Sequence, residues 1–385
     1  MIIDCKPSKL TLRVYNVGFG DCFLLTFHYP ARDRHLLIDF GSTGAGTQAG
    51  MPVLLRIAKD ICKRCCGKLD AVVATHRHRD HVNGFATRKD GKGPGNIIAA
   101  CRPELVVQPW TEHPDAPSGT CFSMFEERAG LIGENNLPNL SAVKNLQKMA
   151  RSNRYVHFGA DSGLETLLPG VTAQVLGPPT LEQSRSIRKK RSEDPGEFWL
   201  TRALFTHTAG SRLFPRAATC PFSRYAPDTR WFLRRLRSVR SDRLLEIVRE
   251  LDTVLNNTSV ILLFEVGNKK LLFPGDAQIE NWSYALSHPR VRQMLAGVDL
   301  YKVGHHGSRN ATPKSLWNLF TRRSATPAPG RLRTVLSTMA QKFGEVDRGT
   351  EVPRASLVQT LKAQSDYFST QDIQGKLYAD ISITL

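Results

Sequence analysis

The sequence has no apolar run of about 18 residues, the length that a transmembrane helix needs, anywhere in its 385 residues. Its first residues also lack the basic, apolar and small-residue regions of a signal peptide. Neither an internal repeat nor a long low-complexity segment is present, and the composition excludes a collagen-like or coiled-coil fibre. With 41% apolar residues, the chain can bury a sizeable core. We therefore expect a cytoplasmic globular protein that does not associate with membranes.

Acidic residues are few compared with basic ones. Asp and Glu total 35 against 53 Lys and Arg, which gives a net charge of +18. Such an excess predicts a polyanionic partner, nucleic acid above all, although basic proteins with protein partners also occur. Part of the excess is local: residues 181–240 hold twelve Arg and two Lys against five acids, which gives 14 − 5 = +9.

We interpret residues 181–240 as a basic helical insertion in a single domain that spans residues 1–385. Aromatic residues lie among its arginines, and residues 230–255 have helical periodicity. The functional hypothesis is a surface that follows phosphates and stacks aromatics on bases, with Arg234, Arg235 and Arg237 as nucleic-acid contacts. The alternative is a solvated helix face whose aromatics form the insertion's own core.

Strand and helix signals alternate on both sides of that insertion. Helical periodicity occurs at residues 51–65, 139–153 and 354–364. Short apolar, β-rich segments predict strands at residues 10–18, 21–30, 34–40, 69–76, 103–110, 171–177, 258–267, 269–276, 299–308, 334–338 and 376–385. A Gly-Asn turn joins the strands of the 258–276 region as a hairpin. This alternation predicts an α/β sheet covered by helices.

The strongest chemical signal is a His-rich segment directly after the predicted strand 69–76. His76, His78, Asp80 and His81 fall within six residues. Neutral imidazole and carboxylate suit Zn²⁺ first, with Mn²⁺ or Fe as alternatives. In a turn, His76 and His78 can face one side while Asp80 and His81 face a second centre. The spacing therefore predicts one or two divalent transition metals, and the alternative is a solvated basic loop.

This His-x-His-x-Asp-His pattern resembles the signature of the metallo-β-lactamase superfamily. Two later segments, FPGD at 273–276 and VGHHGS at 303–308, are similar to the other metal motifs of that family. The resemblance implies that Asp276 bridges two metals and that His306, which precedes a Gly, is the last ligand. Residues 14–21, residues 257–263 and the HHGS segment narrow the resemblance to the ComEC-like branch, that is, the hydrolase domain of a DNA-uptake channel and its stand-alone relatives.

The resemblance covers roughly residues 10–110 and 255–385, and it implies a fold and an activity. The fold would be a four-layer αββα sandwich, the metallo-β-lactamase fold, with both sheets inside and the metal loops at one edge. The activity would be that of a metal-dependent hydrolase, a phosphodiesterase or nuclease that attacks DNA with a metal-activated hydroxide. Asp80 would orient the nucleophile, and His305 or Lys302 would protonate the leaving oxygen. Asp21 and Asp39 could support ligand imidazoles.

One departure keeps other functions open. Many two-metal members of that family have a further His before the bridging Asp, where this chain has Asp252, Asn256 and Asn257. One alternative is a metallohydrolase of a small substrate such as a phosphorylcholine ester, a lactone or a nucleotide. Another is a nucleic-acid-binding or partner-binding module with an incomplete metal site. The net charge favours the nuclease over the small-substrate enzyme, and the six candidate ligands favour an enzyme over a binding module.

Overall fold

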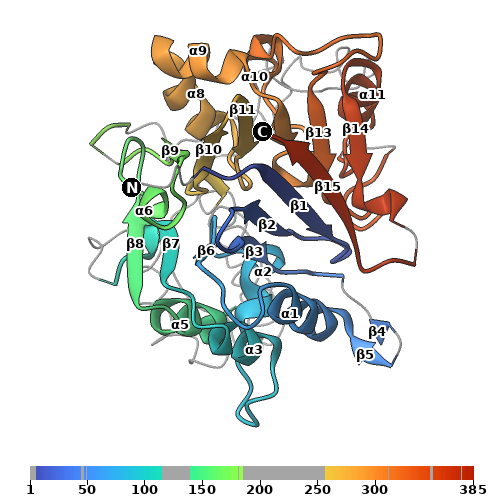
Figure 1. Cartoon of the computed structure of the whole chain (residues 1–385). Coiled ribbons are helices and arrows are strands. Elements are labelled where there is room, and N and C mark those ends of the chain that lie inside the picture. Colours follow the sequence, from blue (N-terminus) through green and yellow to red (C-terminus); the bar gives the residue numbers. More distant parts are fainter. Residues whose placement is uncertain are drawn as a thin grey trace, which may run out of the picture.

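The computed structural model describes residues 6–44, 47–48, 50–114, 139–180, 182–184, 256–310, 312–346, 350–373 and 375–385. Two large mixed sheets form the centre of this part of the chain, and helices lie on both sides of them (Figure 1). The structure therefore confirms a mixed α/β chain built on two sheets. Except for residues 182–184, the predicted insertion at 181–240 lies outside the described residues, as do Arg234, Arg235 and Arg237.

The first sheet has seven strands, and its N-terminal strands alternate in direction. In spatial order they are β15 (Tyr378–Thr384), β1 (Lys9–Tyr15), β2 (Cys22–His28), β3 (Arg34–Phe40), β6 (Ala71–Val73), β7 (Leu105–Pro109) and β8 (Ser152–Val156). Neighbours from β15 to β3 are antiparallel, whereas β3, β6, β7 and β8 run parallel. A separate short hairpin joins β4 (Thr47–Gln48) to β5 (Met51–Pro52).

The second sheet has six strands. In spatial order they are β14 (Asp366–Ser369), β13 (Arg333–Leu336), β12 (Leu300–Lys302), β11 (Lys269–Phe273), β10 (Ile261–Val266) and β9 (Val171–Gly177). The predicted Gly-Asn hairpin is confirmed, because β10 and β11 pair antiparallel on either side of it. Strands β11 to β14 run parallel, so their carboxyl ends point to one edge.

Three buried apolar clusters show how the sheets and helices pack. Alternate residues of β1, such as Leu10 and Leu12, share a cluster with Leu262 and Phe264 of β10, so the two sheets face each other. The second cluster lies on the other face of the first sheet, under α1 (Val53–Arg64), α3 (Pro94–Ala100) and α5 (Leu140–Lys148). The third lies between the second sheet and α8 (Ile279–Ser287), α9 (Pro289–Ala296), α10 (Lys314–Leu319) and α11 (Ala355–Gln364).

Two expectations about the helices need correction or completion. The helix predicted for residues 139–153 is too long, since α5 ends at Lys148 and β8 begins at Ser152. Pairing with β7 decides this boundary: the Ser152 N–H donates to the Glu104 carbonyl, and the residues that follow continue the parallel ladder. Helices α3, α8, α9 and α10 were not predicted, because each is only six to nine residues long. No helix in the described ranges is long and apolar enough to cross a membrane.

The topology brings the carboxyl ends of strands from both sheets to one edge. In the first sheet β1, β3 and β6 share a direction, because β1 and β3 are both antiparallel to β2 and β6 is parallel to β3. In the second sheet β11, β12 and β13 share a direction. A hydrogen bond from the Val260 N–H to the Thr75 carbonyl (2.9 Å) joins the two sheets there. The segments that carry the predicted metal ligands follow these strand ends.

Candidate metal centre

The His-rich loop follows β6, and close backbone packing fixes it. His76 and His78 lie in the loop, whereas Asp80 and His81 lie in the short helix α2 (Arg79–Val82). A Cβ atom on Gly41 would come within 2.4 Å of the Asp80 carbonyl carbon, so only glycine fits there. The Asp21 N–H donates to the Asp80 carbonyl at 3.0 Å. The loops after β1 and β3 therefore hold the backbone of α2.

Four predicted ligands form a compact group that could hold a metal ion. Each of them offers one ligand atom, and these atoms lie within 4.8 Å of one another: Asp80, His81, Asp276 and His306. The His81 Nε2 atom lies 3.1 Å from Asp276 Oδ2, and His306 Nε2 lies 3.1 Å from Asp80 Oδ2. Asp80 is partly exposed and the other three side chains are buried. The donor set of two imidazoles and two carboxylates suits a divalent transition metal.

His76 and His78 lie beside this group and face each other. Their Nε2 and Nδ1 atoms, respectively, are 3.0 Å apart, and His76 Nε2 lies 3.9 Å from Asp276 Oδ2. The same Asp276 oxygen lies 3.6 Å from His306 Nε2. The Asp276 carboxylate therefore stands between the His76–His78 pair and the group with His81 and His306, where a bridging ligand would stand.

Hydrogen bonds on the far side of three imidazoles direct their Nε2 atoms to the centre. The Nδ1 atom of His81 lies 2.8 Å from Asp39 Oδ2, and that of His306 lies 3.0 Å from the Ser337 carbonyl. Both acceptors leave the proton on Nδ1. The buried Nε2 atoms of His81 and His306 have no hydrogen bond of good geometry within the described part of the chain. Orphaned buried lone pairs that face carboxylates fit the ligands of a metal ion.

The third imidazole is oriented through Thr75. The Thr75 hydroxyl donates to Asp39 Oδ2 at 2.7 Å and lies 3.2 Å from His76 Nδ1, so it can accept the Nδ1 proton of His76. The Thr75 N–H also donates to Asp39 Oδ1 at 2.7 Å. Asp39 thus orients two predicted ligands, His81 directly and His76 through Thr75. The expectation that Asp39 supports ligand imidazoles agrees with these contacts.

The buried carboxylates of the centre require positive charge beside them. Burial lowers the pKa of His81, but the charges of Asp276, Asp39 and Asp21 outweigh it and raise that pKa well above its ordinary value. For Asp276 the effects are reversed. Burial raises the pKa of this carboxyl group, but His81 and His306 outweigh burial and hold the pKa well below its ordinary value. Carboxylates that stay ionised in a buried site need positive charge beside them, from protonated imidazoles or from a metal ion.

Lys302 lies under the centre and not at its open side. Its side chain is buried, its ammonium pairs with Asp21, and it donates to the Gly275 carbonyl at 3.1 Å. Its Nζ atom lies 3.7 Å from Asp276 Oδ1. Burial lowers the pKa of Lys302, but Asp21 and Asp276 raise it above its ordinary value. An ammonium held in this way is a poor acid, so the geometry favours a positioning role, and its predicted role as proton donor stays a prediction.

His305 is held beside Asp276 in a strained backbone. His305 and His306 both have left-handed φ angles, 41° and 51°. The His305 N–H donates to Asp276 Oδ1 at 3.1 Å. Its Nδ1 lies 2.8 Å from the hydroxyl of Ser308, which donates onward to Asn310, so the neutral ring keeps its proton on Nδ1. Burial, opposed by Asp276, lowers the pKa of His305 to about 4, so this ring is neutral at pH 7 and accepts a proton before it can donate one.

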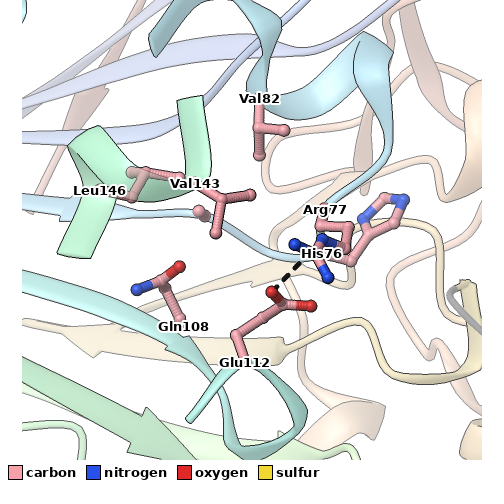
Figure 2. Close-up of a pocket in the computed structure, with 8 residues that line it drawn as sticks. His76, Arg77, Val82, Gln108, Glu112, Val143 and Leu146 are labelled. Atoms are coloured by element: carbon pink, nitrogen blue, oxygen red, sulfur yellow. Dashed lines mark ion pairs between the residues drawn. The ribbon is translucent and has the colours of Figure 1, made fainter. Parts of the chain in front are cut away.

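A buried ion pair between Arg77 and Glu112 holds the His-rich loop in place. Arg77 lies between His76 and His78 in sequence, and its side chain extends into a small pocket, where its Nε lies 3.5 Å from Glu112 Oε2 (Figure 2). Val82, Gln108, Val143 and Leu146 complete the lining of this pocket together with Ala74 and His76. Burial raises the pKa of Glu112, and Arg77 opposes this shift. No sequence pattern indicated Glu112, because it lies 35 residues beyond Arg77 in a different loop.

The segment where the family resemblance implied a further histidine carries buried amides. Asn256 and Asn257 are buried, and the Oδ1 atom of each has no hydrogen-bond partner among the described residues. Ser259, two residues later, accepts a hydrogen bond from the Asp276 N–H at 3.2 Å. This segment therefore contacts the backbone of Asp276 through Ser259, and it contains two buried amides and no imidazole.

Comparisons with known proteins add no assignment. No family model matches the chain, and no curated protein matches it significantly. The structure brings four of the six predicted ligands, Asp80, His81, Asp276 and His306, into one group, and it places His76 and His78 beside that group. It also adds contacts that the sequence did not indicate, from Ser337 to His306 and from Glu112 to Arg77.

Proposed function

We propose that this protein is a metal-dependent hydrolase of phosphodiesters, with DNA as the favoured substrate and Zn²⁺ as the first metal to test. The observation that carries the proposal is the buried group Asp80, His81, Asp276 and His306 with the His76–His78 pair beside it. The packing order of helices, two facing sheets and helices supports a metallo-β-lactamase fold of the ComEC-like type.

The residues would divide between two adjacent metal positions. His76 and His78 would serve one, Asp80, His81 and His306 the other, and Asp276 both. A divalent metal held there would polarise a phosphoryl oxygen and make bound water acidic enough to attack at neutral pH. The position of His76 and His78 would lack a third imidazole, and the segment where the resemblance implied that histidine carries the buried amides of Asn256 and Asn257 instead.

The chain's own groups would orient the substrate and the protons. Asp80 is the ligand carboxylate with partial exposure, its side chain 16% exposed, so it faces incoming substrate and water. The buried Lys302 ammonium holds Asp21 and faces Asp276, which fixes the carboxylates that carry the centre. The neutral His305 ring can take up a proton released by attacking water and return it to the leaving oxygen, as a general base and acid.

The charge of the chain favours a phosphodiester over an uncharged ester. The net charge of +18 attracts polyanions, and the exposed Arg79 belongs to the same loop as the ligand histidines. A lactone or another neutral small substrate is not attracted by this positive charge.

Metal content and hydrolysis should be measured together. Purified protein is stripped with a chelator, reloaded with Zn²⁺, Mn²⁺ or Fe²⁺, and assayed on plasmid DNA, a single-stranded oligonucleotide and methyl p-nitrophenyl phosphate. Activity should vanish on stripping and return with at least one metal. His81→Ala should lose both metal and activity, whereas the matched control His157→Ala, a half-buried histidine outside the centre, should keep both. Hydrolysis that survives stripping, or its absence with every metal and substrate, would refute the proposal.

A further inference from the structure

The large hydrophobic side chains that are exposed in the described ranges all lie in one loop. They are Met339 (37% exposed), Phe343 (44%) and Val346 (72%), and the loop follows β13. Elsewhere in these ranges large apolar side chains are at least partly covered. Because exposed apolar side chains cost free energy in water, three of them in one loop suggest a binding surface.

This loop is fastened to the metal centre at both ends. At its start, the Ser337 carbonyl accepts from His306 Nδ1, and the Ser337 hydroxyl donates to the Gly20 carbonyl. At its end, the Arg354 N–H donates to the Gly307 carbonyl at 2.8 Å, directly after the ligand His306. The loop therefore holds its apolar side chains at a fixed place beside the centre.

Phe343 is joined to the metal ligands by a chain of aromatic contacts. Its ring centroid lies 4.6 Å from that of Phe19, and Phe19 lies 4.3 Å from the ring of His306. The backbone of Phe343 is paired, since its carbonyl accepts from the Val352 N–H at 3.0 Å. The exposed part of the ring is thus a rigid aromatic surface one side chain away from a ligand histidine.

A cation accompanies this aromatic surface. Lys342 is exposed, and its ammonium lies 5.9 Å from the centroid of the Phe343 ring. Met339 extends the apolar surface toward the loops after β1 and β3, where its Sδ atom would lie 3.4 Å from a Cβ atom on Gly44. An aromatic face with a neighbouring ammonium matches a nucleobase with its phosphate.

We infer that the 339–346 loop is the base-binding surface of the enzyme, on which Phe343 stacks a base of single-stranded nucleic acid next to the scissile phosphate, while Lys342 pairs with a flanking phosphate. The inference rests on the proposed phosphodiesterase activity. Single strands are specified because a base in a duplex has both faces stacked and can offer neither to Phe343. The surface selects substrate and takes no part in the bond-breaking step.

Substitutions at Phe343 separate stacking from apolar contact. Phe343→Leu keeps an apolar side chain but removes the aromatic face, and Phe343→Trp keeps the face. With metal-loaded protein, Phe343→Leu should raise KM for a single-stranded oligonucleotide about tenfold, because the stacking of one base is lost. Its kcat/KM for methyl p-nitrophenyl phosphate, which has no base, should change less than twofold. Phe343→Trp should behave like the wild type on both substrates.

Lys342 has its own test in the salt dependence of binding. Lys342→Gln should flatten the log–log salt slope for a single strand by about 0.7, the value of one phosphate contact. The matched control is Lys68→Gln, which removes an exposed Lys that pairs with Glu104 at the surface. That control should leave the slope unchanged.

A binding measurement keeps the inference separate from the proposed activity. The probe is a phosphorothioate oligonucleotide with 2-aminopurine, whose fluorescence is quenched when it stacks. Wild type and Phe343→Trp should quench it and Phe343→Leu should not. If the wild type hydrolyses no phosphodiester, the proposed function fails while quenching still decides the inference. Equal KM and quenching in Phe343→Leu and wild type overturn it. The inference is also overturned if Phe343→Leu lowers kcat/KM equally for the oligonucleotide and for methyl p-nitrophenyl phosphate. It is overturned as well if the protein is a dimer that Phe343→Leu dissociates while nucleic-acid binding is unchanged.

Discussion

Asp39→Asn tests how the hydrogen bonds around the centre orient its histidines, and it replaces none of the predicted metal ligands. Asp39 is buried and has a left-handed φ of 54°, which asparagine also adopts, so the backbone should not change. Its carboxylate accepts from Thr75 twice and from His81 Nδ1 once, all within 2.8 Å. An amide can still accept the Thr75 N–H, but its NH₂ group then faces the His81 N–H. One buried donor is left unsatisfied, at a cost of about 1–3 kcal/mol.

The consequence for metal binding follows from the loss of orientation at His81. Removing such a supporting partner typically costs 10–100-fold in metal affinity, or about 1.4–2.7 kcal/mol. Competition between the protein and a chromogenic chelator at pH 7.5 measures this affinity directly. Asp60→Asn is the matched control, because Asp60 also accepts hydrogen bonds from Arg13 and Tyr15 but lies outside the centre. A folded Asp39→Asn protein with metal affinity within twofold of wild type would refute the reasoning.

Three further predictions concern the ligands and the basic segment. Joint replacement of His76, His78 and His81 by Ala should remove most bound metal, and equal metal content by elemental analysis would refute the site. Asp80→Ala should reduce hydrolysis at least about 100-fold, more than loss of a supporting partner, with little change in thermal stability. Undiminished turnover would exclude Asp80. Joint replacement of Arg234, Arg235 and Arg237 by Ala should flatten the duplex-DNA salt slope by up to about 2.7, three contacts' worth, in filter-binding titrations. An unaltered slope in a protein with unchanged circular dichroism would mean that these residues do not touch DNA.

The sequence was informative where a local pattern has one structural outcome. The Gly-Asn turn between two β-rich segments predicted the β10–β11 hairpin, and the apolar, β-rich segment at residues 10–18 predicted the buried strand β1. The end of α5 was not predictable in this way, because Ser152 leaves the helical pattern only to pair with Leu105 of β7, which lies 47 residues earlier in the chain. Short helices such as α10 have too few turns to show periodicity.

The same distinction applies to the centre. His76, His78, Asp80 and His81 are close in sequence, so their spacing alone indicated a metal site. Asp276 and His306 were joined to them only by resemblance to family motifs, and the two-sheet topology is what places them nearby. The supporting partners had no sequence signal of comparable strength. Ser337 acts through its carbonyl, which every residue has, and Phe343 is distinguished only by its exposure in the folded chain.

The buried charges of the centre give a further argument for two metals and an anionic substrate. Four carboxylates meet there, Asp21, Asp39, Asp80 and Asp276, against the single ammonium of Lys302. With neutral imidazoles the sum is −4 + 1 = −3, a charge that a buried site does not sustain without cations. One divalent ion would leave −1 and repel a phosphodiester. Two would leave +1, or zero once a hydroxide is bound, and would therefore not repel the single negative charge of a phosphodiester. In the absence of metal, protonation of His81 and His306, whose pKa values the carboxylates raise against burial, supplies part of the same compensation.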